Sequence, residues 1–159
     1  MVEIAQEYFS RWVVYRRSFS AYAALIREKR RSWKTLVTVY WGKTGTGKTR
    51  TVYDAVGNSE LWVPGDYQWF DGYKGQENVL LDDYRGEYPL QMLLKLLDRY
   101  PMRVPVKGDF TEWFPISVYI TSNVNPENWY PEADYASVRA LMRRIDNSNE
   151  IKQPLYEDI

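Results

Sequence analysis

The chain has 159 residues, a formal net charge of zero, no cysteine and no histidine. A hydrophobic fraction of 45% and an aromatic fraction of 16% can build a packed core, which excludes an intrinsically disordered chain. Without cysteine or histidine, disulfides, zinc fingers, thiol nucleophiles and imidazole bases are excluded, so any hydrolysis must rest on carboxylates and a bound ion. No apolar stretch approaches the roughly 20 residues of a membrane-spanning helix, so we expect a soluble, intracellular protein with no membrane partner.

Residues 1–34 differ from the rest of the chain in charge and in pattern. They hold eight basic and three acidic residues, a net charge of +5, so the remainder carries −5. Apolar residues recur at helical spacing from Ile4 to Ile26, which predicts a helix with one apolar stripe. The stripe would pack on its own domain or on copies of itself, and the basic residues would contact a polyanion or form a solvated face. We therefore expect two units, a helical segment at 1–34 and a second domain at 35–159.

From Leu36 onward, short apolar strands alternate with helices. This alternation predicts an α/β fold with a mainly parallel sheet, whose ligands bind at the carboxyl ends of the strands. The expected elements are a strand at 36–41, a helix from Lys48 to about Gly57, a strand at 77–83, a helix from Pro89 to Pro101, a hairpin with arms at 102–108 and 110–115, a strand at 116–123 and an amphipathic helix marked by Val138, Leu141, Met142 and Ile145. Pro105 restricts the first hairpin arm to an edge position.

The stretch YWGKTGTGKTR, residues 40–50, fits the phosphate-binding pattern G-x-x-x-x-G-K-[ST] between a predicted strand and a predicted helix. Its glycines let the backbone turn tightly and point successive N–H groups at phosphate oxygens. Lys48 would neutralise the β- and γ-phosphates, and Thr49 would place its hydroxyl on Mg²⁺. The expected nucleotide-binding residues are Gly42, Lys43, Thr44, Gly45, Thr46, Gly47, Lys48 and Thr49.

Two other strand ends supply the groups that hydrolysis needs. Asp82 would hold the Mg²⁺, mostly through water, and Asp83 would orient or deprotonate the attacking water. Asn123 would hydrogen-bond that water and a phosphate oxygen, although asparagine after a strand is also ordinary turn chemistry. Arg139 and Arg143 lie at i and i+4 of a predicted helix, where two cations repel each other unless an anion lies opposite. These two and Arg144 are candidates for an arginine supplied in trans, and an exposed basic face is the alternative.

These motifs, in the order GKTGTGKT, VLLDDY, VPVKGDF, YITSN and LMRRI, resemble the superfamily 3 helicases of small viruses. The surrounding words WFDGYKGQENVLLDDY, LLDRYP and ITSNVNPENWY are similar to the replication-associated (Rep) proteins of circoviruses and related circular single-stranded DNA viruses. The resemblance covers residues 35–145. It implies a P-loop, AAA+-like ring, typically a hexamer, that hydrolyses ATP with Mg²⁺ at subunit interfaces and threads single-stranded DNA during rolling-circle replication in the host cell nucleus.

The resemblance also implies roles for individual residues. Lys48 and Thr49 match Walker A, Asp82 and Asp83 match Walker B, and Asn123 matches sensor 1. Lys107 matches the hairpin lysine that grips DNA in the ring channel, and Gly108 lets that tip turn. Arg144 best matches the arginine finger, with Arg143 a close second, and the N-terminal stripe matches the oligomerisation collar. Relatives carry a nickase domain that needs histidine, so we expect that domain to be absent and the chain to be an ATPase fragment.

Other functions stay open beside a DNA translocase. A P-loop nucleotide or small-molecule kinase predicts an arginine-rich lid and no channel hairpin, and an oligomeric scaffold would bind nucleotide without turnover. An RNA-directed ATPase is also possible, because one lysine does not read the 2′-hydroxyl. Trp113 and Phe114 would either stack on bases or belong to the core. For the aromatic cluster we expect packing alone; its members are Trp62, Tyr67, Trp69, Phe70 and Tyr73.

Overall fold

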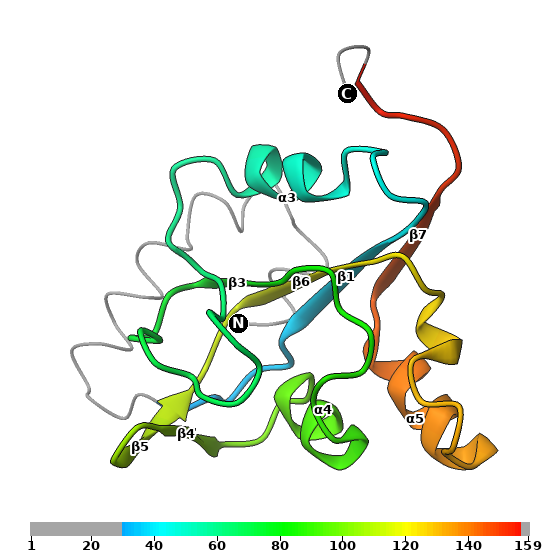
Figure 1. The fold of residues 1–159 in the computed structure, drawn as a ribbon. Helices are drawn as coiled ribbons and strands as arrows, with labels where there is room; N and C mark the ends of the chain where they lie inside the picture. Colours follow the sequence, from blue (N-terminus) through cyan, green and yellow to red (C-terminus); the bar gives the residue numbers. More distant parts are fainter. Residues whose placement is uncertain (1–29, 157–159) are drawn as a thin grey trace.

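The computed structural model of the chain describes residues 30–156, which form a sheet covered by helices on both sides (Figure 1). Five strands make up the sheet in the order β2-β3-β6-β1-β7, and every neighbouring pair is parallel. The elements are β1 (Leu36–Gly42), α3 (Lys48–Val56), β2 (Leu61–Trp62), β3 (Asn78–Leu81), α4 (Leu90–Leu96), β4 (Met102–Val106), β5 (Asp109–Trp113), β6 (Ser117–Ser122), the 3₁₀ turn η1 (Pro126–Asn128), α5 (Tyr135–Arg144) and β7 (Asn147–Ile151).

The expected α/β fold with a mainly parallel sheet is confirmed, and it is consistent with a P-loop ATPase. Two of the five strands were not expected from the sequence. β2 has only two residues, and β7 has the sequence NSNEI, which offers no apolar alternation because four of its five residues are exposed at the sheet edge. Helix α5 begins at Tyr135, earlier than the apolar pattern indicates, because Asp134 caps it by accepting a hydrogen bond from the backbone N–H of Ser137.

Alternating side chains along the strands divide the core into two layers. Leu80 packs on one side of the sheet with Val52 and Val56 of α3. Val39 and Ile120 point to the other side, where the main core contains the leucines of α4 and Leu141 of α5. Figure 1 shows the same arrangement, with α3 above the sheet and α4 and α5 below it. Because both faces of the sheet are covered, all four residues of β3 are buried.

Two basic residues near the start of the described chain are built into this domain. Arg31 is 1% exposed and donates hydrogen bonds to the carbonyl oxygens of Lys95 and Leu96, at 2.6 and 2.7 Å, at the C-terminal end of α4. Lys34 donates to the carbonyl oxygen of Arg144 at 2.9 Å, at the end of α5. Both cations satisfy carbonyl groups that a helix end leaves unpaired. Burial lowers the pKa of Arg31 to about 10.

The expected helical stripe from Ile4 to Ile26 lies outside the described residues, so the N-terminal oligomerisation segment at 1–34 stays a prediction. The boundary between this segment and the domain at 35–159 likewise stays a prediction. Among residues 30–156, no helix has both the length and the apolar character needed to cross a bilayer.

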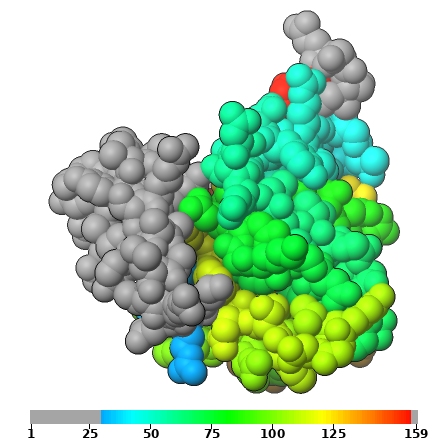
Figure 2. Space-filling view, turned by 90° about the vertical axis from the view of Figure 1, so that its left-hand side faces the viewer, coloured from blue at the N-terminus to red at the C-terminus, as the bar shows by residue number. Residues whose placement is uncertain are grey.

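The expected hairpin is confirmed as a separate antiparallel pair of strands, β4 and β5. It forms the lower end of the face in Figure 2, far from α3 at the top, and Figure 1 shows the same separation.

Trp113 is 1% exposed, so the core interpretation is correct and base stacking on Trp113 is excluded. Phe114 packs edge-on against Tyr73, with ring centroids 6.2 Å apart. Trp62, Phe70 and Tyr73 are buried in the core, as expected of that cluster.

Candidate active site

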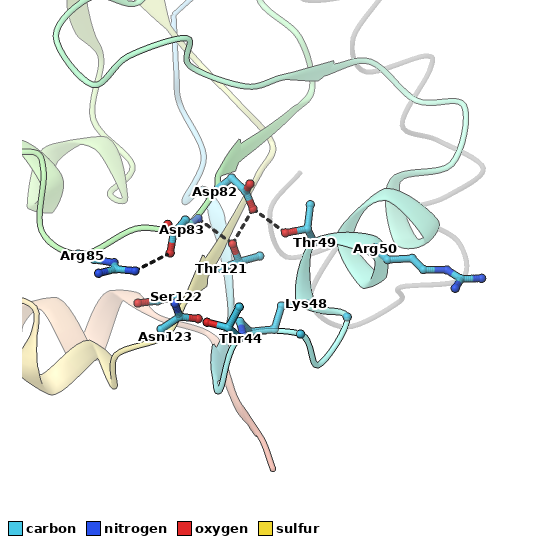
Figure 3. A pocket seen from close by; sticks show the side chains of 12 residues that line it. Thr44, Lys48, Thr49, Arg50, Asp82, Asp83, Arg85, Thr121, Ser122 and Asn123 are labelled. Carbon is cyan, nitrogen blue, oxygen red and sulfur yellow. Dashed lines mark hydrogen bonds and ion pairs between the residues drawn. The ribbon is translucent and has the colours of Figure 1, made fainter. Parts of the chain in front are cut away.

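A cavity of about 450 Å³ opens where β1, β3 and β6 end (Figure 3). β6 lies between β1 and β3 in the sheet, so the loop after β1 and the acids after β3 face each other across the end of β6. The cavity lies at the carboxyl ends of parallel strands, where α/β sheets bind their ligands. Its lining residues are Thr44, Gly45, Gly47, Lys48, Thr49, Arg50, Asp82, Asp83, Arg85, Thr121, Ser122 and Asn123.

The loop between β1 and α3 is folded around the ammonium group of Lys48. The Lys48 Nζ donates to the carbonyl oxygens of Gly42 and Lys43, at 3.0 and 2.6 Å. Burial lowers the pKa of Lys48, and the negative charges of Asp83 and Asp82 oppose that shift. Gly47 has a φ of 87° and caps α3 without a side-chain hydrogen bond, so the first N–H groups of the helix lie at the cavity. A helix start of this kind favours a phosphate group.

Asp82 and Thr49 meet on the wall of the cavity. The Thr49 hydroxyl donates to Asp82 Oδ1 at 2.7 Å, and the hydroxyl of Thr121 donates to the same oxygen at 2.7 Å. The Tyr67 hydroxyl donates to the Asp82 carbonyl oxygen at 2.7 Å, which holds the backbone as well. A hydroxyl and a carboxylate in contact offer the hard oxygen ligands that Mg²⁺ prefers, and phosphate and water oxygens would complete six ligands. The donor set therefore fits Mg²⁺.

Asp83 points into the mouth of the cavity from a constrained backbone. Its φ is 50°, the one positive value at a non-glycine residue within 30–156. Its N–H donates to Thr121 Oγ1 at 2.9 Å, so a single hydroxyl binds the side chain of Asp82 and the backbone of Asp83. The Asp83 carboxylate is 62% exposed, and Arg85 lies 3.6 Å from it. A half-exposed acid beside open solvent can reach a water molecule in the cavity.

Asn123 lies at the end of β6, where it lines the cavity beside Thr44 and Lys48 (Figure 3). The expected residues that line this one cavity are Thr44, Gly45, Gly47, Lys48, Thr49, Asp82, Asp83 and Asn123, whereas Gly42, Lys43 and Thr46 of the same loop are not among its lining residues. Thr121 and Arg85 were not expected. The sequence does not identify Thr121 as a site residue, because threonine is common inside strands. Its neighbours in sequence also do not show that its hydroxyl faces two acids.

A comparison with protein families matches residues 38–124, more than half of the chain, to the family described as RNA helicase. The chain belongs to the RNA helicase family. A helicase domain hydrolyses ATP, so this membership agrees with the phosphate loop and the paired acids of the cavity.

The helicase-family chain is also similar to curated viral proteins. It is 41% identical over 147 residues to the replication-associated protein of Canary circovirus and 40% identical over 158 residues to that of Pigeon circovirus. It is 40% identical over 138 residues to that of Porcine circovirus 1. These alignments cover 92%, 99% and 84% of the chain but 49%, 49% and 44% of the relatives. The chain spans about half the length of the curated relatives it matches, and the resemblance to the superfamily 3 helicase region of Rep proteins is confirmed.

The arginines of α5 lie away from the cavity of their own helicase domain and differ in environment. Arg144 is held by α4, because its Nε donates to the Leu94 carbonyl oxygen at 2.9 Å and its Nη2 forms an ion pair with Asp98 at 3.0 Å. Its Nη1 donates to the Ala140 carbonyl oxygen at 2.8 Å. Arg143 is exposed. The guanidinium of Arg144 is thus bound within its own domain, whereas that of Arg143 faces outward.

Lys107 and Gly108 form the two-residue turn between β4 and β5 of the helicase domain, and Figure 1 shows this pair of strands on the opposite side of the molecule from α3. Gly108 has a φ of 84°, a backbone conformation that glycine adopts more readily than residues with a side chain. The backbone N–H of Lys107 donates to Asp71 Oδ1 at 2.8 Å, which fixes the turn while the side chain stays exposed.

Proposed function

We propose that this chain is an ATP-dependent DNA helicase or translocase that acts on single-stranded DNA as a ring, with six subunits and an AAA+-like arrangement. Its setting would be viral rolling-circle replication in the host cell nucleus. One observation carries the proposal: the phosphate loop, the two acids and Asn123 converge on one cavity at the ends of three adjacent strands. The family match and the similarity to viral replication-associated proteins also support a helicase function.

In this proposal the loop from Gly42 to Thr49 binds the phosphates of ATP through its N–H groups and Lys48. Bound Mg²⁺ supplies charge neutralisation of the phosphates, and Thr49 and Asp82 are the residues that would hold it. Asp83 orients the attacking water and accepts its proton. Asn123 hydrogen-bonds the same water and a γ-phosphate oxygen, and it repels neither because it carries no charge.

The cavity as it stands has no arginine from α5, so we infer that the final positive charge comes from a neighbouring subunit. The resemblance to superfamily 3 helicases favours Arg144 for this role, with Arg143 and Arg139 as alternatives. The geometry favours Arg143, because Arg144 already binds Leu94 and Asp98 inside its own domain and would have to release both. A finger in trans stabilises the charge of the transition state by about 10³ to 10⁵ in rate where it operates.

For the DNA contact we propose Lys107 at the tip of the β4–β5 hairpin. The tip is exposed and turns through Gly108, and no residue of the hairpin lines the nucleotide cavity. A lysine here would contact a phosphate without reading sequence, and the contact would weaken as salt rises. The same hairpin argues against the kinase alternative, which predicts a lid and no such projection.

RNA is the second candidate strand, because the matched family is described as RNA helicase. DNA is favoured because the similar viral proteins are named as replication-associated. Lys107 alone does not separate the two, since a phosphate contact ignores the 2′-hydroxyl.

ATP hydrolysis by the wild-type chain, measured alone, with single-stranded DNA and with single-stranded RNA, tests the function. We expect turnover that DNA stimulates more than RNA, and near-complete loss of turnover in Lys48→Ala. Turnover that neither nucleic acid changes would support the kinase, and stimulation by RNA alone would identify the strand as RNA. Native mass measurement with and without an ATP analogue tests the ring, because a hexamer predicts six copies in the presence of nucleotide.

A further inference from the structure

The residues that follow β7 return to the phosphate loop. We define residues 152–156 as the C-terminal strap. It leaves the end of β7 and runs beside the loop that follows β1 (Figure 1), where the Leu155 N–H donates to the Thr46 carbonyl oxygen at 3.0 Å. β7 itself already touches the start of that loop: a Cβ on Gly42 would lie 2.3 Å from the Ile151 carbonyl oxygen. Gly42 at the beginning of the loop is therefore in contact with β7, and Thr46 further along the loop is in contact with the strap.

Tyr156 continues these contacts onto the first two turns of α3. Its hydroxyl donates to Asp54 Oδ2 at 2.9 Å and lies 3.4 Å from Thr51 Oγ1. The guanidinium of Arg50 lies over the Tyr156 ring, 4.0 Å from its centroid. α3 begins at Lys48, so Tyr156 is fixed to the same short helix that presents Lys48 and Thr49 to the cavity.

The contact at Thr46 has a directional consequence for phosphate binding. The Thr46 carbonyl and the Gly47 N–H belong to one planar trans peptide, in which the C=O and N–H bonds point in opposite directions. Leu155 holds the carbonyl on the strap side of the loop. The Gly47 N–H must then point the other way, and Gly47 lines the cavity. A donor fixed by its own peptide plane does not have to be reoriented when a phosphate arrives.

Tyr156 also influences where a nearby cation lies. Arg50 lines the cavity next to Thr49, yet Figure 3 shows its side chain pointing away from Asp82 and Asp83. The guanidinium lies instead over the Tyr156 ring, a favourable site for a cation. This arrangement keeps the long side chain outside the space that the phosphates would occupy.

We propose that the C-terminal strap is a positioning element for the phosphate cradle, in which Leu155 orients the Thr46–Gly47 peptide and Tyr156 fixes the first two turns of α3. The inference rests on the proposed function only in that the cradle binds a nucleotide. Leu155 and Tyr156 are positioning residues, because they act through Thr46 and α3 and do not line the cavity. The strap sets nucleotide affinity, and the chemistry of hydrolysis belongs to the acids and Asn123.

The matched pair Leu155→Pro and Leu155→Ala isolates the backbone contact in the full chain. Proline lacks the N–H, whereas alanine keeps it and removes a side chain that is already 46% exposed. We expect equilibrium titration with a fluorescent ADP analogue to give about tenfold weaker binding for Leu155→Pro and no more than about a twofold change for Leu155→Ala. In steady-state hydrolysis, KM should rise with the same ratio while kcat stays near the wild-type value. Equal affinities for the two variants would overturn the proposal.

Tyr156 supplies an independent pair should the proline variant fail to fold in a thermal melt. Tyr156→Phe keeps the ring beneath Arg50 and loses the bond to Asp54, whereas Tyr156→Ala loses both. We expect affinity to fall about threefold in the first and about tenfold in the second, and wild-type affinity in Tyr156→Ala would contradict the proposal. Lys48→Ala is titrated in parallel. Nucleotide binding unaffected by Lys48→Ala would refute the proposed function, whereas binding lost in Lys48→Ala but unchanged in all strap variants would refute the strap alone.

Discussion

Thr121→Val is the change that tests how the paired acids are held. Thr121 is 2% exposed, and its hydroxyl donates to Asp82 at 2.7 Å while it accepts from the Asp83 N–H at 2.9 Å. Valine has nearly the same shape, so no cavity forms, but both hydrogen bonds are lost. We expect Asp82 and Asp83 to lose their fixed relation while the phosphate loop remains intact.

The size of the effect follows from the two bonds. A hydrogen bond to a charged acceptor contributes about 1.5–3 kcal/mol, and an N–H left unpaired in a buried position costs about 1–3 kcal/mol. Thr49 still donates to Asp82 and the bond from the Asp83 N–H is only partly buried, so we expect a loss in the free energy of unfolding near the low end of the sum, about 2–3 kcal/mol. At roughly 2–4 °C per kcal/mol for a chain of this size, the melting temperature falls by about 5–10 °C. A carboxylate freed from a bond of about 2 kcal/mol lowers kcat by roughly 30-fold.

The assay compares Thr121→Val with Thr121→Ser, which keeps the hydroxyl. Steady-state ATP hydrolysis over a Mg²⁺ titration gives kcat and the Mg²⁺ requirement, and nucleotide titration in EDTA reports the phosphate loop alone. We expect the valine variant to lose kcat and to need more Mg²⁺, with unchanged affinity in EDTA, and the serine variant to stay within about threefold of the wild type. If valine and serine gave the same kcat and the same Mg²⁺ dependence, the hydroxyl would have no role in holding the acids.

Two further predictions concern the arginines of α5 and the hairpin. Arg143→Ala should lower turnover by at least about 10³-fold with little effect on folding, whereas Arg144→Ala should lower the melting temperature because Leu94 and Asp98 lose their partner. Mixing Arg143→Ala with Lys48→Ala subunits should restore part of the turnover, since each supplies what the other lacks; no recovery in mixed oligomers would count against an arginine in trans. Lys107→Ala should weaken single-strand binding and reduce the salt slope by about one while basal ATP hydrolysis stays unchanged, as read from fluorescence anisotropy at several salt concentrations. Binding equal to the wild type at every salt concentration would remove Lys107 from the DNA contact.

The phosphate loop, the acids and Asn123 could be predicted because each directly follows a short apolar strand. In each case the strand and the polar residues that follow it are adjacent in the sequence. A parallel sheet places the carboxyl ends of its strands at one edge, so these residues come together when the sheet forms. Thr121 could not be identified this way. Its importance depends on which neighbours surround β6, and that order is a property of the folded sheet.

Contacts between distant parts of the chain account for the other misses. Leu155 contacts Thr46 and Tyr156 contacts Asp54, although the members of each pair lie about 100 residues apart in the sequence. The spacing of apolar residues along the chain does not predict such contacts. Arg143 and Arg144 are adjacent and chemically identical, so only the position of α4 separates an exposed arginine from one bound to Asp98. β7 lacks the apolar alternation by which strands are found, because its edge position leaves most of it exposed.

The place of β6 in the sheet also determines when the site can form during folding. β1 pairs with β6 along one edge and with β7 along the other, and residue 36 lies beside residue 117. Both partner strands are therefore synthesised much later than β1, so β1 cannot pair until then. Long-range parallel pairing is slow, and unpaired apolar strands invite aggregation. A nascent chain that ends before β6 would therefore contain the complete phosphate-loop sequence without the means to fold it. Nucleotide binding would then require that synthesis has passed β6 and β7, and ATP would stabilise the domain only after that point.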